Sequence, residues 1–355
     1  VATMVLGFQV WIHHMFATGI PALALSFFGA ASLVISIPSA VAVFAWIATI
    51  WLGRPVFKTP FLFFAAFVLL FVIGGLSGVM TAAVPADLQL NETYFVVAHL
   101  HYVLLGINVF PVVGGIYYWF PKVTGRMLDE KLGKWNFWVM FIGFNIGFFP
   151  MHIAGLMGMP RRIYTYSGDM GWDTVNMVTS VGSFLFAAGL LIFMVNIVIS
   201  LKRGARAECN PWDAPTLEWS VPSPPPAYNF AVIPVIASRH PLWEGRLGEH
   251  GARSSLDEGY LLTHGRETMG TTLRAARPDI ILKMPEDSYA PFWLGLFSAL
   301  MLAALLLHWW LFTGLMAAGC GAALVAWMWP REKLVQRVSA KEREQTAPES
   351  GERHG

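Results

Sequence analysis

Long apolar stretches constrain this chain more than any other feature of its sequence. A helix needs about 20 mostly apolar residues to cross the hydrocarbon core of a bilayer. Stretches near or above that length predict spans at 1–17, 22–52, 60–84, 94–120, 134–157 and 172–201, with a closing pair at 290–311 and 313–329. Because 55% of the residues are hydrophobic and 13% are charged, we expect an all-α, polytopic membrane helix bundle rather than a soluble domain.

Polar segments divide the chain. A charged, Pro-rich extramembrane segment at 204–289 separates the transmembrane core in 1–203 from a transmembrane hairpin at 290–330, and a polar tail follows at 331–355. The sequence begins with Val1 inside an apolar stretch, so we interpret it as a fragment that lacks its front half. The formal net charge of +2 gives no argument for nucleic-acid binding, and the two distant cysteines predict no disulfide framework.

Basic residues in the connecting loops predict the orientation of the spans. They follow the second, fourth and sixth spans, which the positive-inside rule places on the cytoplasmic side: Arg54, Lys58, Lys122, Arg126, Lys131, Lys134, Lys202, Arg203 and Arg206. Arg161 and Arg162, between the fifth and sixth spans, lie on the outer side against this rule. Two arginines in that position call for a reason, such as a bound anion.

Two histidines, one residue apart, lie inside the fourth span. Residues two apart on an α-helix point about 200° apart, so His99 and His101 leave opposite faces. One metal cannot readily take both, whereas two prosthetic groups on opposite sides of the helix could take one each. Imidazole is the usual axial ligand of haem iron. The alternative is a pair of polar side chains that neighbouring helices satisfy, although ionisable groups within spans usually face a functional interior.

A second pair, His13 and His14, lies near the end of the first span. Adjacent residues on a regular helix point about 100° apart, so the two histidines could share one metal only where the helix ends or distorts. Gly19 and Pro21 favour such a break. Imidazoles suit copper, zinc or iron, and the alternative is an interfacial histidine pair. The expected orientation places this pair at a similar depth to the histidines of the fourth span.

Three motifs, in this order, resemble subunit I of the haem–copper respiratory oxidases, most closely the bacterial cytochrome c oxidase type. They are Ile12–Phe16 (IHHMF), Val97–Tyr102 (VAHLHY) and Gly158–Arg162 (GMPRR). The resemblance covers about residues 1–230 and implies helices seven to twelve of a twelve-helix core. The closing hairpin resembles a pair of helices that some bacterial forms append at the C-terminus.

The resemblance implies a role for each histidine. His13 and His14 match two of the three histidines that hold the copper of the binuclear centre. His99 matches the proximal ligand of the high-spin haem, where oxygen binds, and His101 matches one axial ligand of the low-spin haem. The implied catalytic residues are therefore His13, His14 and His99, and the implied cofactors are copper and two haems, expected to be of a type.

The outer loops match the family in part. Arg161 and Arg162 match a pair that holds haem propionates, and Asp87 matches an acid near the propionates of the high-spin haem. A His-Asp pair that often serves a magnesium site is replaced by Asn91-Glu92. Glu92 could still bind magnesium through its oxygens, whereas the asparagine weakens the case.

A further departure from the family pattern concerns the route by which protons enter. Many relatives carry a lysine in the second span that serves a proton route, and Ala42 stands in its place here. A different route must then serve, such as a water chain past the hydroxyl of Ser39. The absent front half would carry the third copper histidine, the other ligand of the low-spin haem and one proton channel.

The resemblance implies a fragment of the catalytic subunit of a terminal oxidase. The whole enzyme would reduce oxygen to water with proton uptake, in the inner membrane of a bacterium, beside other oxidase subunits and membrane lipid. Its electron donor would be cytochrome c or a quinol, and the isolated fragment would be inactive. The alternatives are a nitric-oxide reductase of the same superfamily and a transporter without haem. The ligand-bearing spans have no interior glutamate, which favours copper over the non-haem iron of the reductase.

Overall fold

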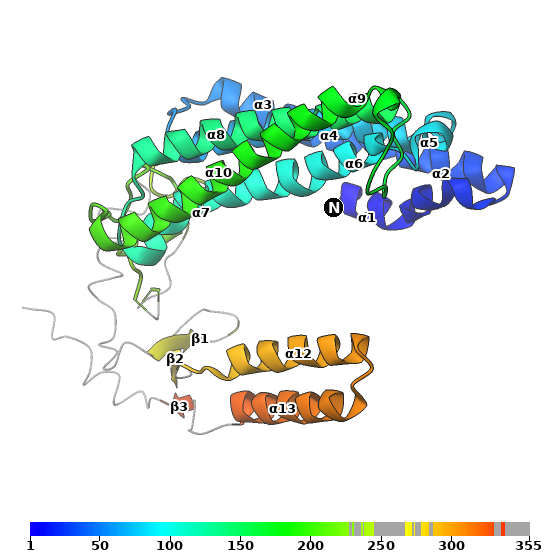
Figure 1. The fold of residues 1–355 in the computed structure, drawn as a ribbon. Helices are drawn as coiled ribbons and strands as arrows, with labels where there is room; N and C mark the ends of the chain where they lie inside the picture. Colours follow the sequence, from blue (N-terminus) through cyan, green and yellow to red (C-terminus); the bar gives the residue numbers. More distant parts are fainter. Residues whose placement is uncertain are drawn as a thin grey trace, which may run out of the picture. The chain divides into compact units, whose positions relative to one another are not determined.

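The chain forms two compact units, Val1–Glu208 and Cys209–Gly355, drawn as a ribbon in Figure 1. The computed structural model describes residues 1–226, 229–230, 236, 238–244, 267–271, 273, 278–283, 287–329 and 335–337. The expected polar tail at 331–355 therefore lies outside the described residues, apart from one short strand.

The first unit is entirely helical in its regular structure. Its longer elements are α1 (Ala2–Gln9), the 3-10 helix η1 (Trp11–Thr18), α2 (Ala22–Val34), α3 (Ser36–Leu52), α4 (Thr59–Ala82), α5 (Val84–Leu90), α6 (Tyr94–His101), the π-helix η2 (Tyr102–Val109), α7 (Phe110–Thr124), α8 (Glu130–Phe148), α9 (Pro150–Leu156) and α10 (Asp173–Arg203). Five stretches of this unit are long and apolar enough to cross a membrane: Ala22–Leu52, Thr59–Ala82, Tyr94–Thr124, Glu130–Leu156 and Asp173–Arg203. The expectation of an all-α, multi-pass membrane bundle is confirmed.

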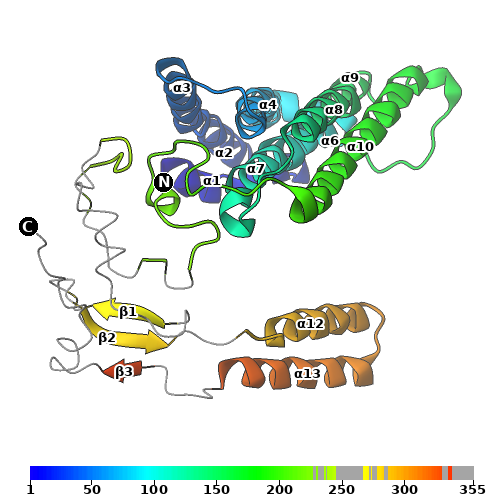
Figure 2. The same ribbon diagram turned by 90° about the vertical axis from the view of Figure 1, so that its left-hand side faces the viewer.

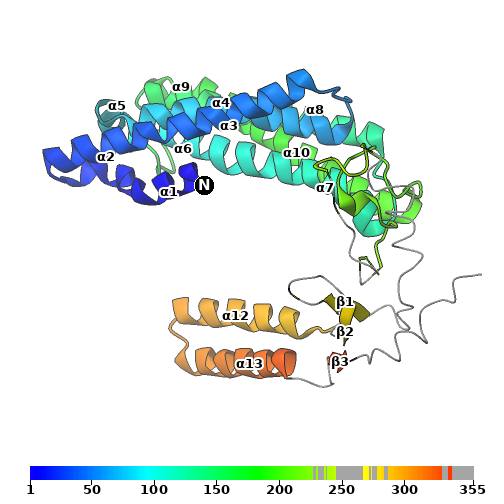
Figure 3. The ribbon, with the colours of Figure 1, turned by 180° about the vertical axis from the view of Figure 1, so that it is seen from behind.

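The long helices run alongside one another, and the short ones gather at one end. Figures 1 and 3 show α1, α2, α5, α6 and α9 at the same end of the unit. The view in Figure 2 shows α3 and α10 on opposite sides of the bundle. The end with the short helices carries the histidines and arginines that the sequence analysis selected.

The first apolar stretch differs from the expected single span. The α-helix stops at Gln9, and a 3-10 helix from Trp11 to Thr18 carries both His13 and His14. The sequence predicted a distortion near Gly19, which does adopt a left-handed φ of 85°. The distortion begins earlier than expected, so the histidine pair lies inside it. Adjacent residues on a 3-10 helix point about 120° apart, which changes how the two rings can meet.

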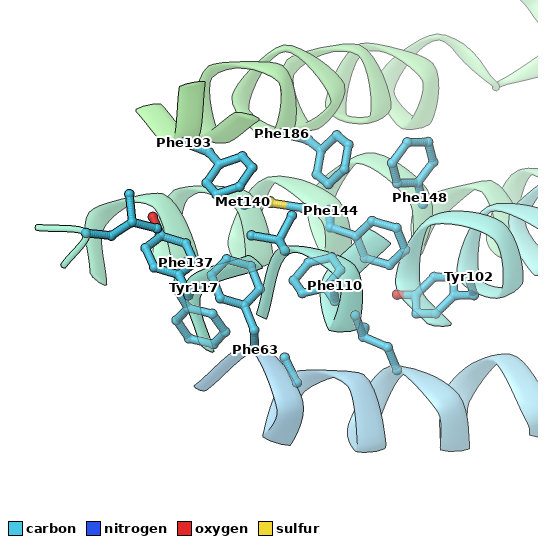
Figure 4. Close-up of a cluster of buried hydrophobic side chains, with 14 of the residues drawn as sticks. Phe63, Tyr102, Phe110, Tyr117, Phe137, Met140, Phe144, Phe148, Phe186 and Phe193 are labelled. Carbon is cyan, nitrogen blue, oxygen red and sulfur yellow. The ribbon is translucent and has the colours of Figure 1, made fainter. Parts of the chain in front are cut away.

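Aromatic rings from four helices form the core of the first unit. Figure 4 shows Phe63 of α4 and Phe110 of α7 facing Phe144 of α8, with Phe186 of α10 above them. The Phe110 and Phe144 ring centroids are 5.5 Å apart, and those of Phe144 and Phe186 are 5.8 Å apart. These spacings are in the range that aromatic pairs prefer. The core therefore fixes α4, α7, α8 and α10 relative to one another.

A buried hydrogen-bond network supports this core where α7, α8 and α10 meet. The Asn196 side-chain nitrogen donates to the Tyr117 hydroxyl at 3.1 Å and to the Asp129 carbonyl at 3.0 Å. The Asn196 side-chain oxygen accepts from the Ser200 hydroxyl at 3.0 Å and from the Asp129 backbone nitrogen at 3.1 Å. Tyr117 in turn donates to Asn136 at 3.2 Å. Buried polar groups need such partners, because an unpaired one costs about 1–3 kcal/mol.

The fourth span is a composite helix. α6 begins after Thr93, whose hydroxyl accepts a hydrogen bond from the Phe95 backbone nitrogen at 3.3 Å. After His101 the helix widens into the π-segment η2, where the Asn108 side chain donates to the carbonyl of Val103, five residues earlier, at 3.0 Å. Pro111, which has no N–H to donate, follows this segment in α7. The histidine-bearing turn itself remains α-helical.

The second unit contains a helical hairpin and a small sheet. α12 (Ala290–Leu306) and α13 (Trp310–Met328) form the hairpin, and α13 is long and apolar enough to cross a membrane. β1 (Glu267–Thr271), β2 (Pro278–Lys283) and β3 (Val335–Arg337) form an antiparallel sheet in the order β1-β2-β3. The sequence predicted the hairpin but no regular structure in the polar segment or the polar tail, so the sheet, which draws β1 and β2 from the segment and β3 from the tail, is an addition to the expected fold.

Candidate functional site

His99 is held against α4 by its Nδ1 atom. Nδ1 lies 3.1 Å from the carbonyl oxygen of Gly74 and 3.0 Å from the hydroxyl of Ser77. Because a carbonyl oxygen only accepts, the proton belongs on Nδ1, and Nε2 keeps a free lone pair. A Cβ atom at Gly78 would lie 3.0 Å from His99 Cε1, so the missing side chain makes room for the ring. A second ring nitrogen bound to a backbone carbonyl is the usual arrangement of a metal-binding histidine.

His101 has the same arrangement on the opposite face of α6. Its Nδ1 atom lies 2.7 Å from the carbonyl oxygen of Val97, one turn earlier in the same helix. Its ring stacks on Phe148 of α8, with centroids 4.5 Å apart and an interplanar angle of 15°. The Nε2 atom of His101 is therefore also free to act as a ligand. Each ring could therefore be an axial ligand of its own haem, with the two haems on opposite sides of α6.

His13 and His14 meet edge to face inside η1. Their Nε2 atoms are 3.2 Å apart, and their ring centroids are 4.3 Å apart. Two nitrogens bound at about 2.0–2.1 Å to one tetrahedral metal lie about 3.3 Å from each other. The pair therefore has the spacing of two ligands of a single metal. The Nδ1 atom of His13 lies 3.3 Å from the Ser32 hydroxyl on α2, which anchors the ring.

The histidine pair of η1 and His99 of α6 lie in the same region of the first unit. His99 is close enough to both His13 and His14 for their charges to influence one another, so η1 and α6 bring three imidazoles into one region. Over the described part of the chain, no group of three or more His, Cys, Asp or Glu residues is arranged to hold one metal. A metal bound by His13 and His14 would need further ligands from elsewhere.

Arg161 and Glu92 form a two-point ion pair beside the start of α6. Arg161 Nε donates to Glu92 Oε2 at 2.9 Å, and its Nη2 donates to Oε1 at 2.6 Å. The hydrogen bond from Arg161 lowers the pKa of Glu92, and the same bond raises the pKa of Arg161. Arg162, with a left-handed φ of 67°, places Nη1 3.8 Å from Oε2. The arginines that the sequence analysis assigned to an anion thus already face a protein carboxylate.

Asp87 lies on α5 and is only 5% exposed. Its Oδ2 atom accepts a hydrogen bond from the Asn91 side chain at 3.1 Å. Burial raises the pKa of Asp87, while the bond from Asn91 and the charges of His14 and Arg161 oppose that rise. Asp87 is therefore near both His14 and Arg161.

The structure adds supporting residues that the sequence analysis missed. Ser77 and Gly74 hold His99, Ser32 holds His13, and Phe148 stacks on His101. Four small residues close together in an otherwise bulky span, Gly74, Gly75, Ser77 and Gly78, were the available signal for the contact with α4. The other supporting contacts join positions far apart in the sequence and left no local signal.

A further histidine, His152, lies on α9. It is 8% exposed, and its Nδ1 atom lies 3.2 Å from the Phe149 carbonyl. Its Nε2 atom is buried without a hydrogen-bond partner. Its ring is 5.0 Å from that of Phe95 and 5.5 Å from that of Tyr102, so it packs against α6 among aromatic side chains.

Comparisons with known proteins agree on one family. The model of the family described as "Cytochrome C and Quinol oxidase polypeptide I" matches residues 1–185. Cytochrome c oxidase subunit 1 of Alkalihalophilus pseudofirmus is 43% identical over 304 residues, which are 84% of this chain and 45% of that protein. Cytochrome c oxidase subunit 1 of Bacillus sp. strain PS3 is 46% identical over 239 residues, covering 67% of this chain and 39% of the relative.

A quinol oxidase subunit has the same sequence identity to this chain as the Bacillus sp. strain PS3 subunit. Quinol oxidase subunit 1 of Bacillus subtilis strain 168 is 46% identical over 242 residues, which are 67% of this chain and 37% of that protein. The chain spans less than half the length of each of these three relatives.

Proposed function

The chain belongs to the cytochrome c and quinol oxidase polypeptide I family, the subunit I family of the haem–copper oxidases, and on that premise we propose that it forms part of the catalytic subunit of a bacterial terminal oxidase. The complete enzyme reduces oxygen to water and takes up protons from the inner side of the membrane. When bound, the haems and copper supply the electron transfer and the oxygen chemistry. The residues of this chain bind and orient those groups.

The arrangement of His99 and His101 carries the proposal. Each ring has its Nδ1 atom on a backbone carbonyl, which fixes the tautomer and directs Nε2 outward as a ligand. Because the two side chains leave α6 on opposite faces, they serve different haems. His99, near the histidine pair of η1, takes the role at the oxygen-reducing centre, and His101, against Phe148, serves the low-spin haem.

His13 and His14 are the proposed copper ligands. Their 3.2 Å Nε2 separation and the anchoring of His13 by Ser32 support this role. Their proximity to His99 fits a centre in which copper and haem iron face each other. The remaining copper ligand would come from the part of subunit I that the relatives carry beyond the matched region.

Arg161, Arg162 and Asp87 are the proposed propionate-binding residues. Glu92 occupies the Nε edge of Arg161 and leaves the Nη1 edge free for a second carboxylate. Arg162 keeps most of its guanidinium available, because its contact with Glu92 is 3.8 Å. A guanidinium can pair with a carboxylate through two parallel hydrogen bonds.

Proton uptake needs a route other than the lysine that Ala42 replaces. The Ser39 hydroxyl donates to the Ile35 carbonyl at 2.9 Å, and the Ser32 hydroxyl donates to the Phe28 carbonyl at 2.6 Å. Each hydroxyl can still accept a hydrogen bond from water. Ser32 also borders His13, so this side of α2 and α3 can lead water toward the copper-type histidines.

The electron donor is cytochrome c or a quinol, and relatives of both kinds match this chain equally well. The proposed partners are the other subunits of the oxidase, and the proposed location is the inner membrane of a bacterium. The comparisons give no support to the nitric-oxide reductase alternative, and the ligand-bearing helices lack the interior glutamates that such a site needs.

Optical spectra of two variants in the complete subunit test the proposal. His101→Ala should remove the low-spin haem spectrum and leave a high-spin haem that binds carbon monoxide. His99→Ala should keep the low-spin spectrum and lose the signal that responds to carbon monoxide. The opposite assignment would show that the two roles are exchanged. Unchanged spectra in both variants would mean that α6 is not the haem-binding helix.

A further inference from the structure

The side chains at the family's magnesium position are already engaged by protein groups. Both oxygens of Glu92 accept hydrogen bonds from Arg161, at 2.6 and 2.9 Å, and Arg162 lies 3.8 Å from one of them. Magnesium requires about six oxygen ligands in near-octahedral geometry and is usually held through one or two carboxylates. An ion at Glu92 would have to displace one guanidinium and approach a second.

Asn91 and Asp87 do not complete a cation site. The Asn91 side-chain nitrogen is directed at Asp87 Oδ2, 3.1 Å away, so the amide acts here as a donor. Asp87 and Glu92 carry two negative charges, and Arg161 and Arg162 carry two positive charges. The cluster is therefore close to neutral without a divalent ion, and the field that would attract one is weak.

The same arginine joins two segments that are far apart in the sequence. Tyr94 N donates to the Met159 carbonyl at 2.9 Å, and Arg161 N donates to the Glu92 carbonyl at 2.9 Å. These bonds connect the residues just before and at the start of α6 with the residues after α9. The Arg161 side chain adds a planar fork, which matches a carboxylate in a way that a lysine cannot.

We propose that Arg161 takes over the structural task of a divalent cation in this protein. It clamps the segment before α6 to the segment after α9 through Glu92, and the Asn91-Glu92 position binds no divalent cation. The clamp fixes the N-terminal end of the helix that carries His99 and His101. The expectation of a cation comes from the family, so this part rests on the proposed function, whereas the clamp rests on the geometry alone.

Manganese substitution tests the absence of a cation. The complete oxidase is purified from cells grown with manganese in place of most magnesium, and bound Mn²⁺ is measured by electron paramagnetic resonance and metal analysis. We expect wild type and Glu92→Gln to give the same signal, which would place any manganese elsewhere. A stoichiometric signal in the wild type that disappears in Glu92→Gln would overturn the inference.

Hydrogen exchange tests the clamp without reference to activity. In Arg161→Lys and Glu92→Gln, the Tyr94 and Arg161 amides should exchange up to about fivefold faster, the range expected for losing a well-formed exposed ion pair. Glu130→Gln is the matched control, because Glu130 accepts its hydrogen bond from Thr59 N instead. Both amides should keep their wild-type rates in this control.

A chelator distinguishes the arginine clamp from a bound divalent cation. EDTA should leave exchange at both amides of the wild type unchanged, and faster exchange after its addition would contradict the clamp. Wild-type rates in both Arg161→Lys and Glu92→Gln would contradict it as well. A wild-type complex without haem spectra would reject the proposed oxidase function and leave the exchange result valid for the clamp.

Discussion

Replacing Gly155 with alanine should force α6 and α9 apart. A Cβ atom at Gly155 would overlap the Phe95 backbone nitrogen and would lie 2.6 Å from Phe95 Cα and 2.7 Å from Phe95 Cβ. Carbon atoms in contact are about 3.5–4.0 Å apart, so the gap must open by at least about 1 Å. A side-chain rotation cannot relieve this contact, because it involves the backbone of the neighbouring helix.

The expected cost follows from that contact. Adding a methyl group to a close-packed interior typically costs about 1–3 kcal/mol, and a clash with backbone belongs at the upper end of that range. The cost also has a local consequence for His99, whose Nδ1 partners both lie on α4, at 3.1 and 3.0 Å. A shift of about 1 Å would disturb both bonds, since hydrogen bonds weaken well before 4 Å. The bond of His101 lies within α6 and should survive.

The assay combines thermal unfolding of the purified complex with carbon-monoxide difference spectra. Gly155→Ala should lower the unfolding temperature and alter the high-spin haem more than the low-spin haem. Gly115→Ala is the control, because a Cβ atom there meets only the Trp119 ring, at 3.4 and 3.6 Å. Alanine is also the better helix former by about 1 kcal/mol, so the control should match or exceed wild-type stability. If both variants behaved alike, close approach of α6 and α9 would not be what positions His99.

Three further predictions use the same complex. Asn196→Ala leaves several buried partners unpaired and should lower the free energy of unfolding by about 2–4 kcal/mol, and an unchanged denaturation midpoint would contradict the network. Burial raises the pKa of Asp87 above its usual 3.8, so folding favours the protonated carboxyl. The free energy of unfolding therefore falls as pH rises from the usual pKa through the raised one, because the buried carboxyl must then ionise. Asp87→Asn should therefore unfold at a higher temperature than wild type at neutral pH, with the difference shrinking toward pH 4; an equal difference at both pH values would refute this. Arg162→Leu should lower a haem midpoint potential on the order of tens of millivolts, because a nearby positive charge favours reduction, and potentiometric titration giving the wild-type value would reject a propionate role.

The periodicity of an α-helix was enough to predict how the histidines of α6 are placed. Because His99 and His101 are two residues apart on a regular helix, their opposite faces follow from the sequence, and the π-segment begins only after them. Their Nδ1 partners could not all be predicted. The Val97 carbonyl lies one turn away, whereas Gly74 and Ser77 belong to another helix, and only the packing of α4 on α6 brings them to His99.

Some features of the outer loops and of the first helix could not be predicted from the sequence. The two arginines after α9 were recognised as unusual, but their partner Glu92 lies 69 residues from Arg161, and no local pattern links such distant loops. A distortion near His13 and His14 was predicted from the glycine and proline that follow them. Its onset at Val10 depends on how this segment packs, since Val10 is 1% exposed.

The π-segment η2 divides the fourth span into two halves, α6 and α7, and different neighbours determine which way the faces of each half point. One half, α6, is oriented by α9 and α4 around the ligands, and the other, α7, is oriented by the aromatic core at Phe110 and Tyr117. Each residue added to or removed from an α-helix turns everything beyond it by about 100°. Deleting one residue from η2 would therefore leave either the ligands or the core side chains facing the wrong way. The length of the segment Tyr102–Val109 is therefore constrained in addition to the identity of its buried residues, Tyr102 and Gly106.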